Sequence, residues 1–518
     1  MTQPVIEPVT VLPIDRYNQE LVANLHPPDW VNPEPASRYN LVVIGAGTAG
    51  LVTAAGAAIL GAKVALVEKH LMGGDCTNVG CVPSKTMIRS ARVVADIKHA
   101  KQFGIGTSNE IDVDFPAVME RLRRIRADIS PHDSAKRFQQ EFGVDVFFGN
   151  ARFSGPDTVD VAGKTLRFTK AAIATGTSPA QLPIVGLEEA GYLTNETVFS
   201  LIERPNRLAV IGAGYIGCEL AQTFQRLGSE VVLLHKHSRI LGREDVDAAE
   251  ILQKTFAREG MQLILKSKIK RVERQDAKKV IYYEVNGQEN AVTVDEILVG
   301  TGRSPNVEGL NLEAVGVKYD QKQGVIVDDY LRTTNPRIYA AGDICMKWKF
   351  THAADAAARI LIQNSLFSIF GIGRKKLSSL TMPWCTYTDP EVAHVGMYEQ
   401  EAQDRGIEVE TVCIPLNQVD RAIVDGEVEG FAKLHVKQGT DKILGATIVA
   451  RHAGEMISEI TLAMTNKLGL KAIANTIHPY PTQAEVIRKA ADKYNLKRLA
   501  SFKKLASTWL SWRAVLDK

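Results

Sequence analysis

The sequence predicts an α/β protein in which two repeated βαβ units are followed by a smaller α+β domain. Two runs rich in Leu, Val and Ile, Tyr39–Ile44 and Arg207–Ile211, each precede a glycine-rich turn and a helical pattern. Runs of this kind are buried in parallel sheets, and the repeat is typical of Rossmann-like nucleotide-binding domains. From about residue 376 to 490, strand-like runs such as Ile443–Val449 precede helical ones, which indicates a separate domain.

Composition excludes several classes of protein. The 518 residues are 45% hydrophobic and 23% charged, as in ordinary globular proteins, and a net charge of +3 does not favour nucleic acid as a main partner. Of the six cysteines only Cys76 and Cys81 are closely spaced, so we do not expect a secreted disulfide framework. Because we find neither a secretory signal nor a transmembrane run, we expect a protein of a reducing compartment, the cytoplasm.

Residues 1–37 are expected to form an N-terminal extension rather than a domain. Asp15 is a candidate N-cap for a short helix that ends at Leu25. Prolines after this helix predict an extended strap: Pro27, Pro28, Pro33 and Pro35.

The first glycine-rich turn, Gly45-Ala-Gly47-Thr-Ala-Gly50, connects the first strand to its helix. In such a turn the first glycine permits the sharp bend, the second admits a pyrophosphate, and the third lets the helix pack closely on the strand. Glu68 follows Gly45 by 23 residues and ends the next strand, where an acid binds ribose hydroxyls. This spacing predicts a dinucleotide site.

The second turn, Gly212-Ala-Gly214-Tyr-Ile-Gly217, has the same spacing, but no carboxylate ends its next strand, Val231–Leu234. Basic residues follow that strand instead: His235, Lys236, His237 and Arg239. Since a carboxylate repels a 2′-phosphate and basic residues attract it, we expect this site to prefer NADPH to NADH. The alternative is a solvated basic turn without such a role.

Cys76 and Cys81 lie just past the first fingerprint. Five helical residues rise by about 7.5 Å, whereas a disulfide needs Cα atoms within about 7 Å. The backbone between the cysteines must therefore be distorted, and Gly80 and Pro83 are suited to distorting it. A thiol pair beside a phosphate-cradling turn suggests electron transfer from a nucleotide cofactor to sulfur.

These features resemble the flavin-dependent pyridine nucleotide–disulfide oxidoreductases, a family that includes glutathione reductase, lipoamide dehydrogenase and mercuric reductase. The resemblance extends over about residues 38–490 and includes further motifs: Ala174-Thr175-Gly176, Gly300-Thr-Gly302-Arg-Ser-Pro-Asn306, Ala340-Ala-Gly-Asp343 and Asp389-Pro390-Glu391. It implies an FAD-binding domain (38–183 and 305–375), a NAD(P)H-binding domain (184–304), an interface domain that forms a homodimer (376–494) and a basic amphipathic tail (495–518).

The resemblance also implies roles for single residues. FAD would be held by the first fingerprint with Glu68, Thr175, Gly176 and Asp343, and NADPH by the second fingerprint with Gly302, His235, Lys236 and Arg239. Cys81 would be the sulfur next to the flavin, and Cys76 the sulfur that exchanges with substrate. Lys85 would lie beside the flavin and pair with Glu219. Tyr215 would be a lid over the flavin.

The C-terminal motif distinguishes members of the family. Disulfide reductases and lipoamide dehydrogenases carry His-Pro-Thr-x-x-Glu, whose histidine is the general acid and base. Aligning Pro481-Thr482-Gln-Ala-Glu485 with this motif places Tyr480 at the histidine's position and His478 two residues upstream. A phenol with a pKa near 10 is a poor proton shuttle at pH 7. Mercuric reductases look similar at this motif.

The resemblance therefore implies reduction of a Hg(II)–thiol complex to Hg(0), with Hg(II) bound by Cys76 and Cys81. Two features depart from mercuric reductases. No cysteine follows Cys413, where that group carries a vicinal pair, and residues 1–37 contain no Cys-x-x-Cys. The alternatives are a lipoamide or glutathione-type disulfide reductase with His478 as its active histidine, a reductase of quinones or other oxidants, and a membrane-associated flavoprotein subunit that acts by binding a partner.

The tail places apolar residues at helical spacing: Leu496, Leu499, Phe502, Leu505, Trp509, Trp512 and Leu516. Basic residues lie mostly between them. We expect an extra helix that packs on its own dimer, and the alternative is docking on an anionic membrane surface.

Overall fold

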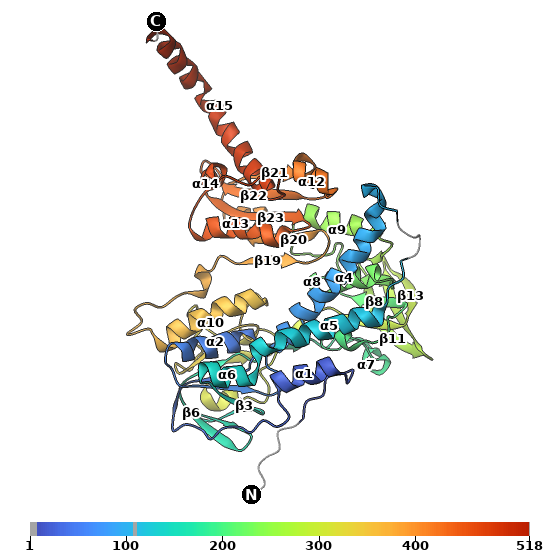
Figure 1. The fold of residues 1–518 in the computed structure, drawn as a ribbon, viewed down its shortest axis with the longest axis vertical. Helices are drawn as coiled ribbons and strands as arrows, with labels where there is room; N and C mark the ends of the chain where they lie inside the picture. Colours follow the sequence, from blue (N-terminus) through green and yellow to red (C-terminus); the bar gives the residue numbers. More distant parts are fainter. Residues whose placement is uncertain (1–7, 107–110, 517–518) are drawn as a thin grey trace. The chain divides into compact units, whose positions relative to one another are not determined.

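The computed structural model describes residues 8–106 and 111–516, and it confirms the α/β class (Figure 1). Two compact units are present. The first runs through Ser238 and resumes over Glu259–Leu380, and the second comprises Arg239–Arg258 and the chain from Thr381 onward. Within the described residues, no helix is both long enough and apolar enough to cross a membrane.

The larger sheet of the first unit confirms the first predicted βαβ unit. Its central strand β1 (Tyr39–Ile44) is buried except at Asn40, as expected for a parallel strand covered on both faces. Its parallel strands are β3 (Asp145–Phe148), β2 (Val64–Glu68), β1, β6 (Lys164–Ile173) and β18 (Ile338–Ala340). The antiparallel strands β5 (Thr158–Val161) and β4 (Arg152–Gly155) extend it from β6.

A second parallel sheet confirms the repeat. Its order is β10 (Gln262–Ile264), β9 (Glu230–Leu234), β8 (Arg207–Ile211) and β14 (Glu296–Val299). Ile211 lies opposite Leu234 and Val299, in the same way that Ile44 of β1 lies opposite Val67 and Ile173. An antiparallel sheet is inserted before β14: β11 (Lys268–Gln275), β12 (Lys278–Val285) and β13 (Gln288–Val294).

The N-terminal extension contains α1 (Arg16–Leu25), and the Asp15 side chain accepts a hydrogen bond from the Asn18 amide at 2.8 Å, as predicted for an N-cap. The strap after it then follows strand β3. Asn32 exchanges two hydrogen bonds with the backbone of Phe148, at 2.8 and 2.9 Å. Residues 1–7 of the extension lie outside the described residues.

Further elements of the first unit surround these sheets. Its other helices are α2 (Thr48–Ile59), α3 (Gly74–Asn78), α4 (Cys81–His99), α5 (Phe115–Ile129), α6 (Ala135–Phe142), α7 (Leu187–Ala190), α8 (Tyr215–Arg226) and α10 (Thr351–Leu366). Two short antiparallel pairs are β7 (Thr177–Pro179) with β15 (Arg303–Pro305), and β16 (Tyr319–Asp320) with β17 (Gly324–Val325).

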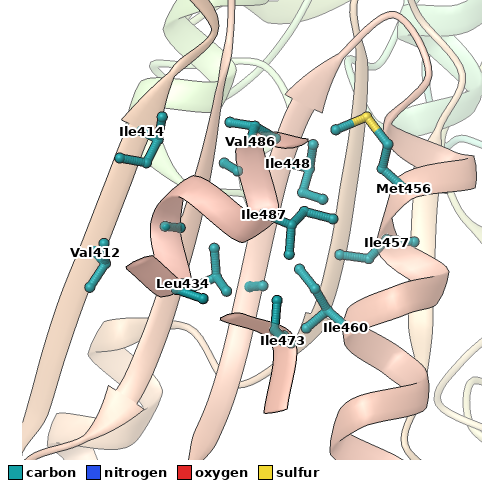
Figure 2. Packing of buried hydrophobic residues seen from close by; sticks show 14 of the residues in the cluster. Val412, Ile414, Leu434, Ile448, Met456, Ile457, Ile460, Ile473, Val486 and Ile487 are labelled. Atoms are coloured by element: carbon teal, nitrogen blue, oxygen red, sulfur yellow. The ribbon is translucent and has the colours of Figure 1, made fainter. Parts of the chain in front are cut away.

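The second unit is an α+β domain around an antiparallel sheet. The strand order is β19 (Pro383–Thr386), β20 (Glu391–Gly396), β23 (Ile443–Ala450), β22 (Phe431–Lys437) and β21 (Val409–Pro415). Its helices are α9 (Val246–Arg258), α11 (Glu399–Asp404), α12 (Asp420–Asp425), α13 (Ala453–Thr465), α14 (Leu470–Asn475) and α15 (Glu485–Leu516). Figure 2 shows side chains of α13, α14 and the first turns of α15 packing against the sheet, among them Ile460, Ile473 and Ile487.

Candidate active site

The two neighbouring cysteines lie on either side of a break between helices. Cys76 is in α3, and Cys81 is the first residue of α4. Gly80 between them has φ −133° and ψ −110°, and a Cβ there would lie 2.7 Å from the carbonyl oxygen of Asp75. This geometry confirms the predicted backbone distortion and explains why the position requires glycine.

The surroundings of the two thiols favour a thiolate at Cys81 over one at Cys76. The Cys76 thiol donates a hydrogen bond to Cys81, which lowers the pKa of Cys81 and raises that of Cys76. The Thr351 hydroxyl lies 3.3 Å from the Cys81 sulfur, and this contact and the charge of Lys85 lower the pKa of Cys81 further, whereas burial opposes them. Thr351 begins α10, whose N-terminus also favours a negative charge. The negative charge of the dithiol is therefore placed on Cys81.

Lys85 and Glu219 form the ion pair that the resemblance implies. Lys85 Nζ lies 2.8 Å from Glu219 Oε2, and the Glu219 side chain is only 4% exposed. The pair connects the cysteine helix α4 to α8, the helix that begins at the second fingerprint. Tyr215, at the start of α8, is 37% exposed, and its ring centroid lies 5.9 Å from that of Phe350.

We expect one thiolate of the reduced protein to titrate below the usual thiol pKa of about 8.5, and to be absent from Cys81→Ser. Cys76→Ala is expected to raise the pKa of Cys81, because it removes the donor that lowers this pKa most. Lys85→Met should raise it and Glu219→Gln should lower it. Ultraviolet thiolate absorbance against pH measures these shifts, with Cys345→Ser as the control, since burial raises the pKa of that thiol to about 12. An unchanged titration in Cys76→Ala would contradict the assignment.

The first fingerprint fits a dinucleotide. A Cβ on Gly45 would lie 2.4 Å from the Ala174 carbonyl oxygen, and one on Gly50 would lie 1.8 Å from that of Gly45. A Cβ on Gly47, in contrast, would have Gly74 Cα as its nearest neighbour, at 3.7 Å. The first and third glycines are thus required by the backbone, and the second leaves the space that a pyrophosphate needs.

The second fingerprint repeats this arrangement. A Cβ on Gly212 would lie 2.2 Å from Thr301 Cγ2, and one on Gly217 would lie 1.9 Å from the Gly212 carbonyl oxygen. A Cβ on Gly214 would have no described atom within 4 Å. The chain therefore has two cradles of the same design, one at the start of α2 and one at the start of α8.

The two cradles differ in the side chain that ends the next strand. In the first, Glu68 Oε2 accepts a hydrogen bond from the Ala46 amide at 2.7 Å. In the second, His235 Nδ1 takes that place and accepts from the Ala213 amide at 3.2 Å. Burial, and then the neighbouring His237 and Lys236, lower the pKa of His235, so that its ring stays neutral and can accept this bond.

Other predicted residues lie where the chain crosses between the sheets. The Thr175 hydroxyl donates to the Asn306 carbonyl oxygen at 2.9 Å, and Asn306 Nδ2 donates to the Thr175 carbonyl oxygen at 2.9 Å. Asp343 accepts from the Thr177 hydroxyl at 3.2 Å. Gly176 and Gly302 both have positive φ, 66° and 71°. Lys236 is exposed, and Arg239 belongs to the second unit, where it donates to the Gly242 carbonyl oxygen.

Sequence reasoning missed several polar residues around the cysteine helix. Arg303 on β15 forms an ion pair with Asp75, the residue before Cys76, and donates to the Thr177 hydroxyl at 2.6 Å. Asp133 accepts from the Thr77 hydroxyl, the residue after Cys76, at 2.6 Å. Asp75 and Thr77 lie next to Cys76 in the sequence, and this adjacency could have identified them as residues of the site. Nothing in the sequence alone identified Asp133 as their neighbour.

Residues of the C-terminal motif lie in the second unit. Tyr480 is 69% exposed, and its hydroxyl donates to Asp420 at 3.0 Å, which raises the pKa of the phenol. Glu485 is only 6% exposed, and its Oε2 atom has no hydrogen-bond partner among the described residues. Both ring nitrogens of His478 already have partners. Nε2 lies 2.9 Å from Glu459, and Nδ1 lies 3.0 Å from the Thr476 carbonyl oxygen.

Comparison with known proteins places this geometry in a family. The family model described as pyridine nucleotide-disulphide oxidoreductase matches residues 39–358, and the model of that family's dimerisation domain matches residues 382–491. A mercuric reductase of Staphylococcus aureus is 38% identical over 453 residues, which are 88% of this chain and 82% of the relative. A dihydrolipoyl dehydrogenase of Chlamydia muridarum is 36% identical over 458 residues, 88% of this chain and 96% of the relative.

Solved structures give the same assignment. LpdA from Mycobacterium tuberculosis superimposes with a TM-score of 0.80 at 27% identity, covering 89% of this chain and all of that one. The HOCl-induced flavoprotein disulfide reductase RclA from Escherichia coli gives a TM-score of 0.78 at 27% identity, covering 88% of this chain and 99% of that one. Family members use FAD and NAD(P)H, and both cradles fit such groups. The chain is an oxidoreductase and belongs to the pyridine nucleotide–disulphide oxidoreductase family.

Proposed function

We propose that the chain is a homodimeric, NADPH-dependent reductase of a soft metal ion, with Hg(II) bound as a thiol complex as its substrate. The balanced reaction is Hg(II) + NADPH → Hg(0) + NADP⁺ + H⁺. The observation that carries the proposal is a polarised dithiol in a chain whose C-terminal motif holds Tyr480 where disulfide reductases hold the acid–base histidine. Metal reduction needs two soft ligands and an electron source but no proton shuttle to a leaving thiol.

Each residue has a defined part in this proposal. Bound FAD supplies a hydride acceptor and a route for electrons to the cysteine sulfurs. Cys81 provides the stabilised thiolate, and Cys76, as the second sulfur, completes a two-thiolate site for Hg(II). Lys85 places a positive charge near that thiolate, held in place by Glu219. Tyr480 and Glu485 of the partner subunit close the site.

We infer that the second cradle prefers NADPH, because His235 occupies the position that Glu68 has in the first cradle. Wild type is expected to have a higher kcat/KM with NADPH than with NADH. His235→Glu should lower the NADPH value by roughly 10- to 100-fold, the size of a charged hydrogen bond of about 1.5–3 kcal/mol, and should raise the NADH value. Lys236→Gln should lower kcat/KM with NADPH and leave the value with NADH unchanged. Equal use of both nucleotides by wild type would contradict the inference.

One screen tests the proposal as a whole. Steady-state NADPH oxidation is measured with Hg(II) in excess thiol, Cu(II), glutathione disulfide, lipoamide and a quinone, while volatile Hg(0) is collected. We expect Hg(II)-dependent oxidation with Hg(0) release and poor use of both disulfides. The dihydrolipoyl dehydrogenase relatives support lipoamide as the second candidate substrate. Rapid lipoamide turnover without Hg(0) would favour that candidate.

A further inference from the structure

Helix α15 changes its surroundings abruptly at Tyr494. Residues of its first turns are buried in the core of the second unit: Val486, Ile487, Ala490, Ala491 and Tyr494. Beyond Tyr494 none of the described side chains is buried, and the helix continues past the sheet of that unit to Leu516 (Figure 1). The predicted tail is therefore part of a longer helix, whose first turns are packed and whose second half is exposed within this chain.

The continuation carries large apolar side chains that are 57–70% exposed: Leu496, Leu499, Leu505, Trp509, Leu510 and Trp512. The rings of Trp509 and Trp512 lie 5.4 Å apart and are neighbours on the helix surface. At about 100° per residue, these six apolar side chains fall within an arc of about 200°, which also contains Lys503 and Arg513, whereas Lys497, Thr508 and Ser511 occupy a separate arc of about 60°. The helix thus has an apolar side and a polar side.

The charge of this segment has a single sign. Residues 495–516 contain no Asp or Glu and five basic residues: Lys497, Arg498, Lys503, Lys504 and Arg513. Of these, Lys497 forms an ion pair with Glu410 of β21 at 3.0 Å. Pairing of this helix with its copy in a second chain would bring two sets of like charges together, which is unfavourable. An apolar groove would cover the tryptophans but would not attract the net positive charge of the segment.

An anionic lipid surface can interact favourably with both the apolar and the basic side chains of the helix. Tryptophan rings are favoured at the level of the headgroups, and basic side chains beside an apolar helix face are attracted by anionic lipids. We propose that the second half of α15, residues 495–516, binds the surface of an anionic membrane and holds the reductase there. This inference is independent of the metal substrate, because no residue of the dithiol site takes part in it.

The test is vesicle flotation of the full-length protein. Vesicles of phosphatidylglycerol with phosphatidylcholine are compared with vesicles of phosphatidylcholine alone. We expect flotation with the anionic vesicles only, weakened by salt because the attraction is screened. Trp509→Ser with Trp512→Ser should reduce the bound fraction by about tenfold or more. Lys503→Glu with Arg513→Glu should also reduce it. NADPH oxidation should be unchanged in both variants.

The matched control removes exposed apolar side chains elsewhere. Phe370→Ser with Ile477→Ser, at positions that are 100% and 92% exposed, should float as wild type does. Size-exclusion chromatography with light scattering of every variant reports the oligomeric state. The proposal is overturned if the wild type does not float, if neutral vesicles bind it equally, or if the tryptophan variant floats unchanged. A tryptophan variant that loses its dimer would show that the apolar side packs on a second copy, which also overturns it.

Discussion

Replacing Cys76 with alanine is expected to reduce Hg(II)-dependent NADPH oxidation, and the release of Hg(0), to background. Thiolates are the ligands that a soft ion such as Hg(II) prefers. Cys76 and Cys81 are hydrogen-bonded to each other beside the Lys85–Glu219 pair, so they can offer two sulfurs to one metal. A single sulfur at Cys81 can form neither the disulfide nor a two-thiolate site. NADPH absorbance and mercury vapour are the two measurements.

The matched control is Cys413→Ala. This thiol lies on β21 in the other unit and is not part of the proposed metal site, so its removal should leave the Hg(II)-dependent rate unchanged. The flavin content of purified Cys76→Ala should equal that of wild type, because the first cradle is the proposed FAD site and Cys76 is not part of it. Hg(0) release at the wild-type rate by a flavin-loaded Cys76→Ala protein would refute metal binding by the pair.

Much of the fold followed from local rules. The two glycine turns were predictable because the glycines stand where a side chain would collide with the backbone or with a bound pyrophosphate. In the structure, a Cβ on Gly45 or Gly50 would lie only 2.4 or 1.8 Å from a backbone oxygen. The break between Cys76 and Cys81 was predictable from helix rise together with the Cα separation that a disulfide allows. The cap at Asp15 required only the preference of an N-terminal amide for a carboxylate.

Contacts between distant parts of the chain were not predictable in this way. The Thr77–Asp133 hydrogen bond joins residues 56 apart, and the Arg303–Asp75 ion pair joins residues 228 apart. The tertiary packing of helices and loops decides which charged side chains come together, and a single sequence does not reveal that packing. The same limit applied to His235, whose role as an acceptor became visible only when its ring was found on the Ala213 amide.

Replacing Tyr480 with histidine is expected to raise the turnover of glutathione disulfide or lipoamide by about 10²–10⁴-fold, the usual contribution of general acid–base catalysis. Wild type should be poor with both substrates by a similar margin. Glu485 supports this expectation, because its buried Oε2 has no partner among the described residues and can accept a hydrogen bond from a histidine ring. Tyr480 instead donates to Asp420. Stopped assays of NADPH consumption with each disulfide measure the gain.

Two further variants separate a proton shuttle from a simple change of shape at this position. Tyr480→Phe removes the hydroxyl without adding an acid or base, so its disulfide turnover should stay as low as that of wild type. Tyr480→His with Glu485→Gln should lose most of the gain, because a neutral amide stabilises the charged imidazolium less well than a carboxylate does. The gain of Tyr480→His should also follow pH through the titration of the new imidazole, near its ordinary pKa of about 6.5. Fast disulfide turnover by wild type that is equal in all three variants, with no Hg(0) evolved, would contradict the assignment of a metal substrate. It would show that the missing histidine does not lower the rate of disulfide reduction.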